Sequence, residues 1–456
     1  MALVLLLVLI ITEIGFAVFE LTRSTAKKTW TKKRLGVIGA EVLIYLLMLV
    51  LPGIDFSFRF KGFVMLMVIR IIFALIFLLI NMKNEKLKKK GSIIVGMIFT
   101  CIFIINSLLP AFIFKDYKGR PLTGSYEVAE SEAILIDHSR VESFETDGSY
   151  REIPVHFYYP ENADEIEGHT LPLIIFSHGA FGYYQSNAST CMELASHGYV
   201  VASLDHPYHA FFTKDSAGKT VTVNPEFIQS AVNIQNDNGE ISEEDIFEIT
   251  SKWMELRIAD LNFVIDTFED AVPADNLGDD WFMNGDSQDD ILSIIKMINI
   301  KKIGLMGHSL GGATCVTVGR RDDISAVIDL DGTMLGEQTG VKDGNPIINE
   351  EPYTTPLFSI DNERHHQECL EAEKAGYNYA NNVILKNATK GYNTYIKGSE
   401  HMNFTDLPLF SPFFAKLLGV GDVDAGECID RVNGLVLEFF DSFLKDAGEF
   451  SVQESY

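Results

Sequence analysis

The first quarter of the chain is a series of long apolar stretches separated by short basic loops. The apolar stretches cover about residues 3–21, 35–51, 63–80 and 93–114. Each is close to the roughly 20 residues needed to span about 30 Å of hydrocarbon. The first stretch lacks the basic segment that precedes the apolar part of a cleaved signal peptide, and three more stretches follow it. The pattern therefore predicts four retained transmembrane helices, which form an anchor over residues 1–116.

The charges of the connecting loops predict the orientation of these helices. The first and third loops are rich in Lys and Arg, whereas the second holds Arg59 and Lys61 together with the acidic Asp55. By the positive-inside rule, the first and third loops face the cytoplasm. Four spans then put both ends of the chain, and everything after Phe114, on the outer side of the cell membrane.

Three charged residues interrupt the apolar stretches, namely Glu13, Glu41 and Arg70. Charged side chains are costly in lipid, so these residues indicate either a pathway through the membrane or pairing between helices. Because there are only three of them and they are isolated, we favour an anchor over a transporter.

Beyond residue 117 the pattern changes to short apolar runs that alternate with helical segments. The predicted strands cover residues 132–140, 151–160, 171–176, 199–204, 303–306, 325–330, 355–360 and 391–396, and the main helices cover residues 186–196, 242–268, 313–318 and 428–444. This alternation is typical of a doubly wound, mostly parallel sheet covered by helices on both faces. We therefore predict an α/β catalytic domain over residues 117–456.

The alternation stops between residues 207 and 300, for longer than an ordinary loop. Residues 210–238 are polar and predict a loop, and a strong helical pattern follows them. We therefore expect a cap or lid insertion within residues 207–300. Trp253 and Trp281 either line an acyl pocket in this region or pack in the core, and packing is the expectation we favour.

The charge of the chain is divided unevenly. The first 120 residues hold 17 basic and 6 acidic side chains, a net charge of +11, and the remainder holds 20 and 57, a net charge of −37. So acidic a segment argues against binding to nucleic acid or to anionic lipid through charge. The five cysteines lack the spacing of a zinc site. Cys369 and Cys428 could pair, and the sequence leaves that open.

Candidate chemistry lies where the strand over residues 303–306 runs into Gly307-His308-Ser309-Leu310-Gly311 and a helix. Strand, sharp turn and helix around a Gly-x-Ser-x-Gly sequence predict a nucleophile elbow with Ser309 at its apex. The turn is strained, and we expect side chains at positions 307 and 311 to collide with the neighbouring strand and helix. An inert serine in a glycine-rich turn is the alternative.

A serine hydroxyl needs an imidazole to take its proton and a carboxylate to orient that imidazole. His401 follows the last predicted strand in a polar turn, where the base of an α/β-hydrolase lies. Asp331 and Asp361 each end a strand after the nucleophile, and topology alone leaves both open as the acid. His365 and His366 come too early in the chain for the base.

The oxyanion that forms during ester attack needs two backbone donors. The Leu310 N–H, at the start of the nucleophile helix, is one candidate. The loop Ser177-His178-Gly179-Ala180 supplies the other, and we expect the Ala180 N–H to be that donor, with His178 supporting the loop.

Several of these segments together resemble the platelet-activating-factor acetylhydrolase family, in the same order and over about residues 130–445. The segments are Arg151-Glu152-Ile153-Pro154-Val155, Phe176-Ser177-His178-Gly179, residues 194–202, Gly307-His308-Ser309-Leu310-Gly311-Gly312, Leu330-Asp331 and His401-Met402-Asn403-Phe404. The resemblance implies that Asp331, not Asp361, is the acid, that His401 is the base and that Ala180 donates to the oxyanion.

These observations predict a membrane-anchored serine ester hydrolase that uses no metal and no cofactor. The resemblance implies short or oxidised acyl chains on phospholipid as substrate. A general carboxylesterase or lipase is the nearest alternative. A membrane sensor or transporter module with a non-catalytic hydrolase-fold domain is an alternative of another class. The sequence leaves the oligomeric state open.

Overall fold

A computed structural model of the chain describes residues 1–161, 168–283 and 287–456. The described residues form two compact units. Unit 1 consists of Met1–Lys118 and Leu409–Phe414, and unit 2 consists of Gly119–Pro408 and Ala415–Tyr456.

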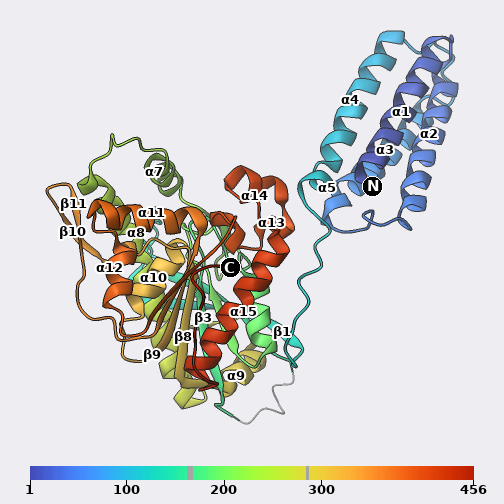
Figure 1. The fold of residues 1–456 in the computed structure, drawn as a ribbon. Helices are drawn as coiled ribbons and strands as arrows, with labels where there is room; N and C mark the ends of the chain where they lie inside the picture. Colours follow the sequence, from blue (N-terminus) through green and yellow to red (C-terminus); the bar gives the residue numbers. More distant parts are fainter. Residues whose placement is uncertain (162–167, 284–286) are drawn as a thin grey trace. The chain divides into compact units, whose positions relative to one another are not determined.

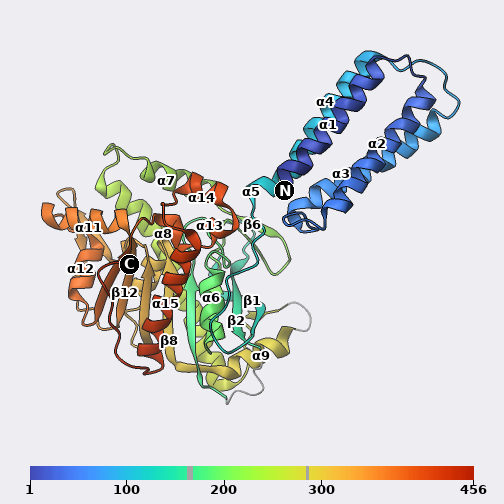
Figure 2. The same ribbon diagram turned by 45° about the vertical axis from the view of Figure 1, so that its right-hand side comes forward.

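Unit 1 is a bundle of four long helices followed by one short helix. The helices are α1 (Ala2–Leu21), α2 (Lys27–Met48), α3 (Phe58–Ile80), α4 (Lys90–Leu108) and α5 (Pro110–Ile113). Figure 2 shows α1 beside α4 and α2 beside α3. A shared apolar core joins the four long helices, and most of their other apolar side chains remain exposed, as expected of a bundle surrounded by lipid.

Three of these helices, α1, α3 and α4, are long and apolar enough to cross a membrane, judged by length and composition alone. The expectation of four such helices therefore has to be corrected at α2. That helix begins at Lys27, and its first eight residues carry five basic side chains. Its apolar part, from Leu35 to Met48, is about 21 Å long at ~1.5 Å per residue, short of the full hydrocarbon thickness.

The core of unit 2 is one nine-stranded sheet. Its strands are β1 (Val128–Val141), β2 (Tyr150–Pro160), β3 (Leu171–Ser177), β4 (Val200–Leu204), β7 (Trp281–Phe282), β8 (Ile298–His308), β9 (Ile324–Leu330), β12 (Leu357–Asn362) and β13 (Gly391–Ile396). The order across the sheet is β13-β12-β9-β8-β3-β4-β2-β1-β7. Six neighbouring strands, β13, β12, β9, β8, β3 and β4, run parallel to one another. The other three, β2, β1 and β7, pair antiparallel at the β4 side of the sheet.

Helices cover both faces of this sheet, so the structure confirms the predicted α/β class and its double winding. The main covering helices are α6 (Ala188–Ser196), α8 (Glu243–Ala274), α9 (Ser287–Met297), α10 (Leu310–Val318), α12 (Ala380–Asn387) and α15 (Ala425–Leu444). Side chains along β3 alternate between two cores: Leu173 and Ile175 pack with α8 and α10, and Ile174 and Phe176 pack with α6 and α15. Figure 1 shows α15 running along β3 and β8.

The segment between β4 and α8 differs from the predicted polar loop. It contains the hairpin β5 (Phe212–Lys214) and β6 (Thr220–Thr222) and the helix α7 (Pro225–Gln235). The α7 N-terminus is capped by Asn224, whose side chain accepts hydrogen bonds from two backbone N–H groups. A capping Asn followed by Pro is a helix-start signal, which could have identified this helix from the sequence.

The remaining elements belong to the C-terminal half of the chain. They are η2 (Leu335–Glu337), β10 (Gln338–Lys342), β11 (Asn345–Ile348), α11 (Glu363–Ala375), η3 (His401–Phe404), α13 (Leu407–Phe410) and α14 (Pro412–Leu418). All five cysteines are free thiols, so Cys369 and Cys428 do not pair in this structure.

Candidate active site

Ser309 lies at the junction of β8 and α10. Its backbone has φ 55° and ψ −125°, a conformation that is strained for a residue with a side chain. A Cβ atom at Gly311 would lie 2.0 Å from the Ser177 carbonyl oxygen on β3, and one at Gly307 would lie 2.3 Å from the Gly311 backbone. The two collisions expected from the sequence are therefore present, and the turn requires glycine at both positions.

Asp331 and His401 are joined by a hydrogen bond. The His401 Nδ1 atom lies 2.6 Å from Asp331 Oδ2. Asp331 follows the last residue of β9, and the Ser309 N–H donates to the carbonyl oxygen of that residue, Leu330, over 2.9 Å. The carboxylate and the serine therefore leave adjacent strands at the same sheet edge. The His401 side chain is 35% exposed, so its ring remains accessible to a substrate.

Ser309 and His401 are brought to the same edge without a direct hydrogen bond. Within the described part of the chain, Ser309 Oγ has no hydrogen-bond partner. The His308 and His401 rings lie 4.6 Å apart, and His308 Nε2 donates to the His401 carbonyl oxygen over 3.2 Å. The residue before the serine thus holds the loop that carries the imidazole.

Asp361, the alternative acid, faces other partners. Its carboxylate accepts from Ser359 Oγ at 2.8 Å and from Asn393 Nδ2 at 2.6 Å. Among the described residues it makes no hydrogen bond to His401. The geometry therefore favours Asp331 over Asp361 as the partner of the imidazole.

Two residues that the sequence reasoning set aside or missed, Asn362 and His365, also bind Asp331. Asn362 donates its backbone N–H over 2.7 Å and its side-chain amide over 2.6 Å, and His365 Nδ1 donates over 3.1 Å. Burial by itself raises the pKa of Asp331, but the hydrogen bonds from His365 and His401 hold it well below its usual range. The carboxylate therefore stays charged opposite His401.

The ligand atoms of Asp331, Asp361 and His365 lie within 4.8 Å of one another. A cation site is one interpretation of such a group. Hydrogen bonding accounts for it equally well, because Asp331 raises the pKa of His365 well above its ordinary value despite burial. A protonated His365 between the two carboxyl groups offsets one negative charge with a group of this chain alone.

The two proposed oxyanion donors are Leu310, which directly follows Ser309, and Ala180, in the loop after β3. Neither N–H has a protein acceptor among the described residues. The loop that carries Ala180 lies directly against the serine, because a Cβ atom at Gly179 would be 3.1 Å from Ser309 Cβ. Both donors are thus available to a ligand, as an oxyanion hole requires.

The loop that carries Ala180, residues 177–180, is the oxyanion loop. It is held in place by Arg257, a fully buried side chain of α8. Its guanidinium donates to the His178 carbonyl oxygen over 2.5 Å and to the Gly179 carbonyl oxygen over 3.2 Å. His178 Nδ1 also donates to the Gly179 carbonyl oxygen, while His178 Nε2 accepts the His206 N–H. Burial lowers the pKa of His178 well below its ordinary value. His178 therefore supports the loop as a neutral ring.

We expect Arg257→Met to lower kcat for a short-chain ester by about 10–100-fold with little change in KM. The substitution takes the Arg257 donor away from the His178 carbonyl oxygen, which costs about 1–3 kcal/mol. It also removes one of the donors to the Gly179 carbonyl oxygen, which frees the Ala180 N–H to move. Steady-state kinetics on correctly folded protein measures the effect. Arg321→Met, which removes a partly exposed guanidinium paired with Asp266 and Asp323, is the matched control. Unchanged kcat in Arg257→Met would rule out the positioning role.

An apolar cluster lies next to the oxyanion donors. Phe227 of α7 and Met254 of α8 pack with Leu310 and Ala313, and the partly buried Trp253 joins them. Trp281 instead packs against Phe268 in the sheet core. Of the two tryptophans singled out in the sequence, Trp253 is therefore the one beside the candidate site.

Comparisons with known proteins agree on one family. A family model described as platelet-activating factor acetylhydrolase, isoform II, matches residues 150–455. Two curated relatives are platelet-activating factor acetylhydrolases. The protein of Bos taurus is 27% identical over 315 residues, covering 64% of this chain and 62% of the relative. The protein of Canis lupus familiaris is 27% identical over 303 residues, covering 63% and 60%.

The matched region spans just over three-fifths of these two relatives. Among solved structures, a ferulic acid esterase from Streptomyces cinnamoneus is 18% identical, with a TM-score of 0.49, over 72% of this chain and 93% of that one.

Proposed function

Because the chain belongs to the platelet-activating factor acetylhydrolase, isoform II, family, we propose that it is a serine ester hydrolase with Ser309, His401 and Asp331 as its catalytic triad. The observation that carries the proposal is the 2.6 Å hydrogen bond between His401 and Asp331, at the sheet edge where strained Ser309 leaves the adjacent strand.

In the proposed reaction, His401 Nε2 takes the hydroxyl proton of Ser309 as Oγ attacks the ester carbonyl carbon. The Leu310 and Ala180 N–H groups stabilise the negative charge on the former carbonyl oxygen. His401 then gives the proton to the leaving alcohol as the ester bond breaks, which leaves an acyl-enzyme. Water attacks the acyl-enzyme with His401 again acting as base, and the carboxylic acid leaves.

We propose glycerophospholipids with a short acyl chain as the substrate class, in line with the name of the relatives. The apolar cluster of Phe227, Met254 and Trp253 beside Leu310 supports binding of an acyl group next to the oxyanion donors. A general carboxylesterase or lipase is the competing function.

A panel of lipid esters tests this proposal on the full-length protein in detergent. We expect kcat/KM for a 2-acetyl glycerophosphocholine to exceed that for its 2-palmitoyl counterpart by about tenfold or more, because the proposed short-chain site would have to accommodate every extra methylene. Equal values would favour a general lipase. No turnover of any ester, with the fold intact, would favour a non-catalytic binding domain.

We further propose that unit 1 anchors the protein in the cell membrane with unit 2 on the outer side. The basic residues at the start of α2 and in the loop before α4 support this orientation by the positive-inside rule. The proposal counts α2 as a fourth crossing despite its short apolar part, because α2 packs along α3 and its first residue, Lys27, bonds to Lys86 in the loop before α4. Protease added to intact cells is expected to digest unit 2, whereas full protection of unit 2 until lysis would reverse the orientation.

A further inference from the structure

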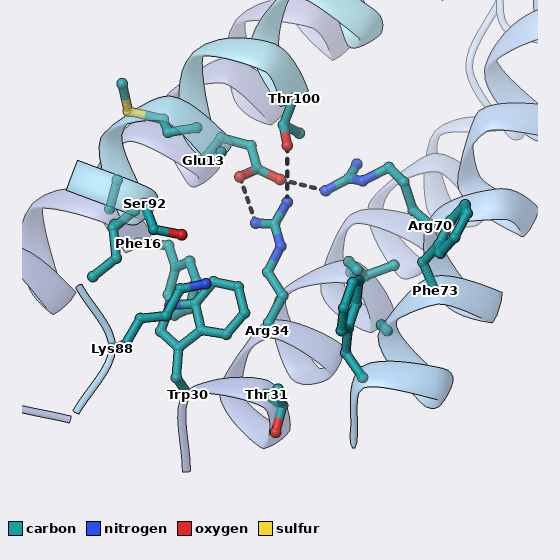
Figure 3. A pocket seen from close by; sticks show the side chains of 17 residues that line it. Glu13, Phe16, Trp30, Thr31, Arg34, Arg70, Phe73, Lys88, Ser92 and Thr100 are labelled. Carbon is teal, nitrogen blue, oxygen red and sulfur yellow. Dashed lines mark hydrogen bonds and ion pairs between the residues drawn. The ribbon is translucent and has the colours of Figure 1, made fainter. Parts of the chain in front are cut away.

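Unit 1 contains a cavity of about 310 Å³ between its four long helices. It runs from the middle of the bundle to the end where the loop between α1 and α2 meets the loop between α3 and α4. Those loops are joined by backbone hydrogen bonds, among them Lys27 to Lys86 and Lys88 to Thr25. Figure 3 shows the cavity with Thr100 at one end and Lys88 and Trp30 at the other.

The deep end of the cavity is occupied by a balanced ion network. Glu13 accepts from Arg34 over 2.5 Å and also from Arg70, and Arg70 pairs with Glu41 over 2.8 Å. Figure 3 shows Glu13 between the two guanidinium groups. Two arginines and two glutamates cancel in charge, so the buried charges singled out in the sequence stabilise the bundle as pairs.

At the loop end of the cavity, positive charge is not balanced by a negative group. Among the described residues Lys88 makes no ion pair, and its ammonium lies 4.0 Å from the centre of the Trp30 ring. Burial and the nearby positive charges of Lys27 and Arg34 lower the pKa of Lys88. The Trp30 Nε1 atom is buried and has no acceptor in the described part of the chain. A cation and an N–H donor therefore lie together without an anion or acceptor.

The walls of the cavity suit an apolar chain. Phe73 and Phe77 of α3 line it and are also about half exposed on the outside of the bundle, at 54% and 51%. Phe16, Ile93 and Met97 line it from α1 and α4. A ligand with an anionic head and a hydrocarbon tail satisfies both parts of the cavity.

We propose that this cavity binds an anionic glycerophospholipid, with a phosphate oxygen at Lys88 and the Trp30 N–H and an acyl chain along the phenylalanine side. The site is distinct from the candidate active site in unit 2. It rests on the proposal that the bundle lies in a membrane, where such lipids are the abundant anions.

Native mass spectrometry of the full-length protein from detergent, after addition of phosphatidylglycerol or phosphatidylcholine, tests the site. We expect the wild type to retain phosphatidylglycerol in preference to phosphatidylcholine. Lys88→Gln should weaken retention by about tenfold or more, since a charge-assisted hydrogen bond is lost. Trp30→Phe keeps an aromatic ring, removes the indole N–H and should weaken retention several-fold. Lys83→Gln, the same change at an exposed position of the same loop, is the control.

Two kinds of result would overturn the proposed lipid site, and each has its own signature. Equal retention of the two lipids, or equal weakening by Lys88→Gln and Lys83→Gln, would overturn the site in favour of general surface electrostatics. Displacement of phosphatidylglycerol by millimolar inorganic phosphate, with phosphate retained instead, would assign the site to the free anion. Because the readout is lipid retention, an inactive esterase would leave the result unchanged, and a failed lipid site would leave ester hydrolysis intact.

Discussion

Ser309→Ala is expected to lower kcat for p-nitrophenyl acetate by roughly 10⁴–10⁶-fold. The substitution removes the only atom that the proposal uses as a nucleophile, while the oxyanion donors remain in place. The small residual rate then reflects those donors alone. Steady-state kinetics on purified full-length protein measures the effect.

The control for this variant is Ser325→Ala, which removes a partly exposed hydroxyl from β9 of the same sheet. Its rate should stay within about twofold of the wild type, since surface substitutions away from a site have small effects. If Ser309→Ala keeps more than about a tenth of the wild-type rate, another group is the nucleophile.

Asp331→Asn is expected to lower kcat by about 10⁴-fold with the fold intact. An amide at this position no longer offers a carboxylate to the His401 Nδ1–H, so the imidazole loses the tautomer and orientation that general-base action requires. Because the pKa of Asp331 is depressed, the stabilisation from its hydrogen bonds is present above its ordinary pKa and is lost only as the pH falls through the lower folded value.

Asp361→Asn is the matched comparison, since it makes the same change one strand away. Burial raises the pKa of Asp361, which favours the neutral form that asparagine resembles. We expect kcat to fall by less than about tenfold, because Asp361 bonds to Ser359 and Asn393 rather than to His401. If Asp361→Asn has the larger effect of the two, the proposed acid is wrong.

The apolar runs of the sequence predicted eight of the nine strands of the central sheet and missed the two-residue edge strand β7. A parallel strand covered on both faces must be apolar throughout, and β3 and β4 have that pattern. The turn after β8 was predictable because only glycine fits where Gly311 meets β3. These features are set by residues close together in the sequence.

Other features depend on how distant elements dock, and the sequence did not reveal them. Asn362 and His365 reach Asp331 because β9 and β12 are neighbours in a register that pairs Leu330 with Ile360. Arg257 reaches the oxyanion loop because α8 packs beneath it. In each case the partner lies tens of residues away, and no local pattern records the contact.

In unit 1, too, the sequence did not predict where a helix begins or which charged residues pair. The apolar stretch over residues 35–51 predicted a span, but the helix begins earlier, at Lys27, and includes the basic loop residues. The pairing of Glu13 with Arg34 joins α1 to α2, and only the packed bundle reveals it. Charges that were isolated in the sequence are therefore paired in the structure.

The most direct test of the proposed triad is covalent labelling of the wild-type protein with a fluorophosphonate, followed by mass spectrometry of its peptides. Phosphonylation of the Ser309 hydroxyl, abolished by prior acylation and strongly slowed in Asp331→Asn, is the predicted result. Labelling at a different residue, or none at Ser309 in protein that hydrolyses esters, would contradict the assignment of this serine as the nucleophile.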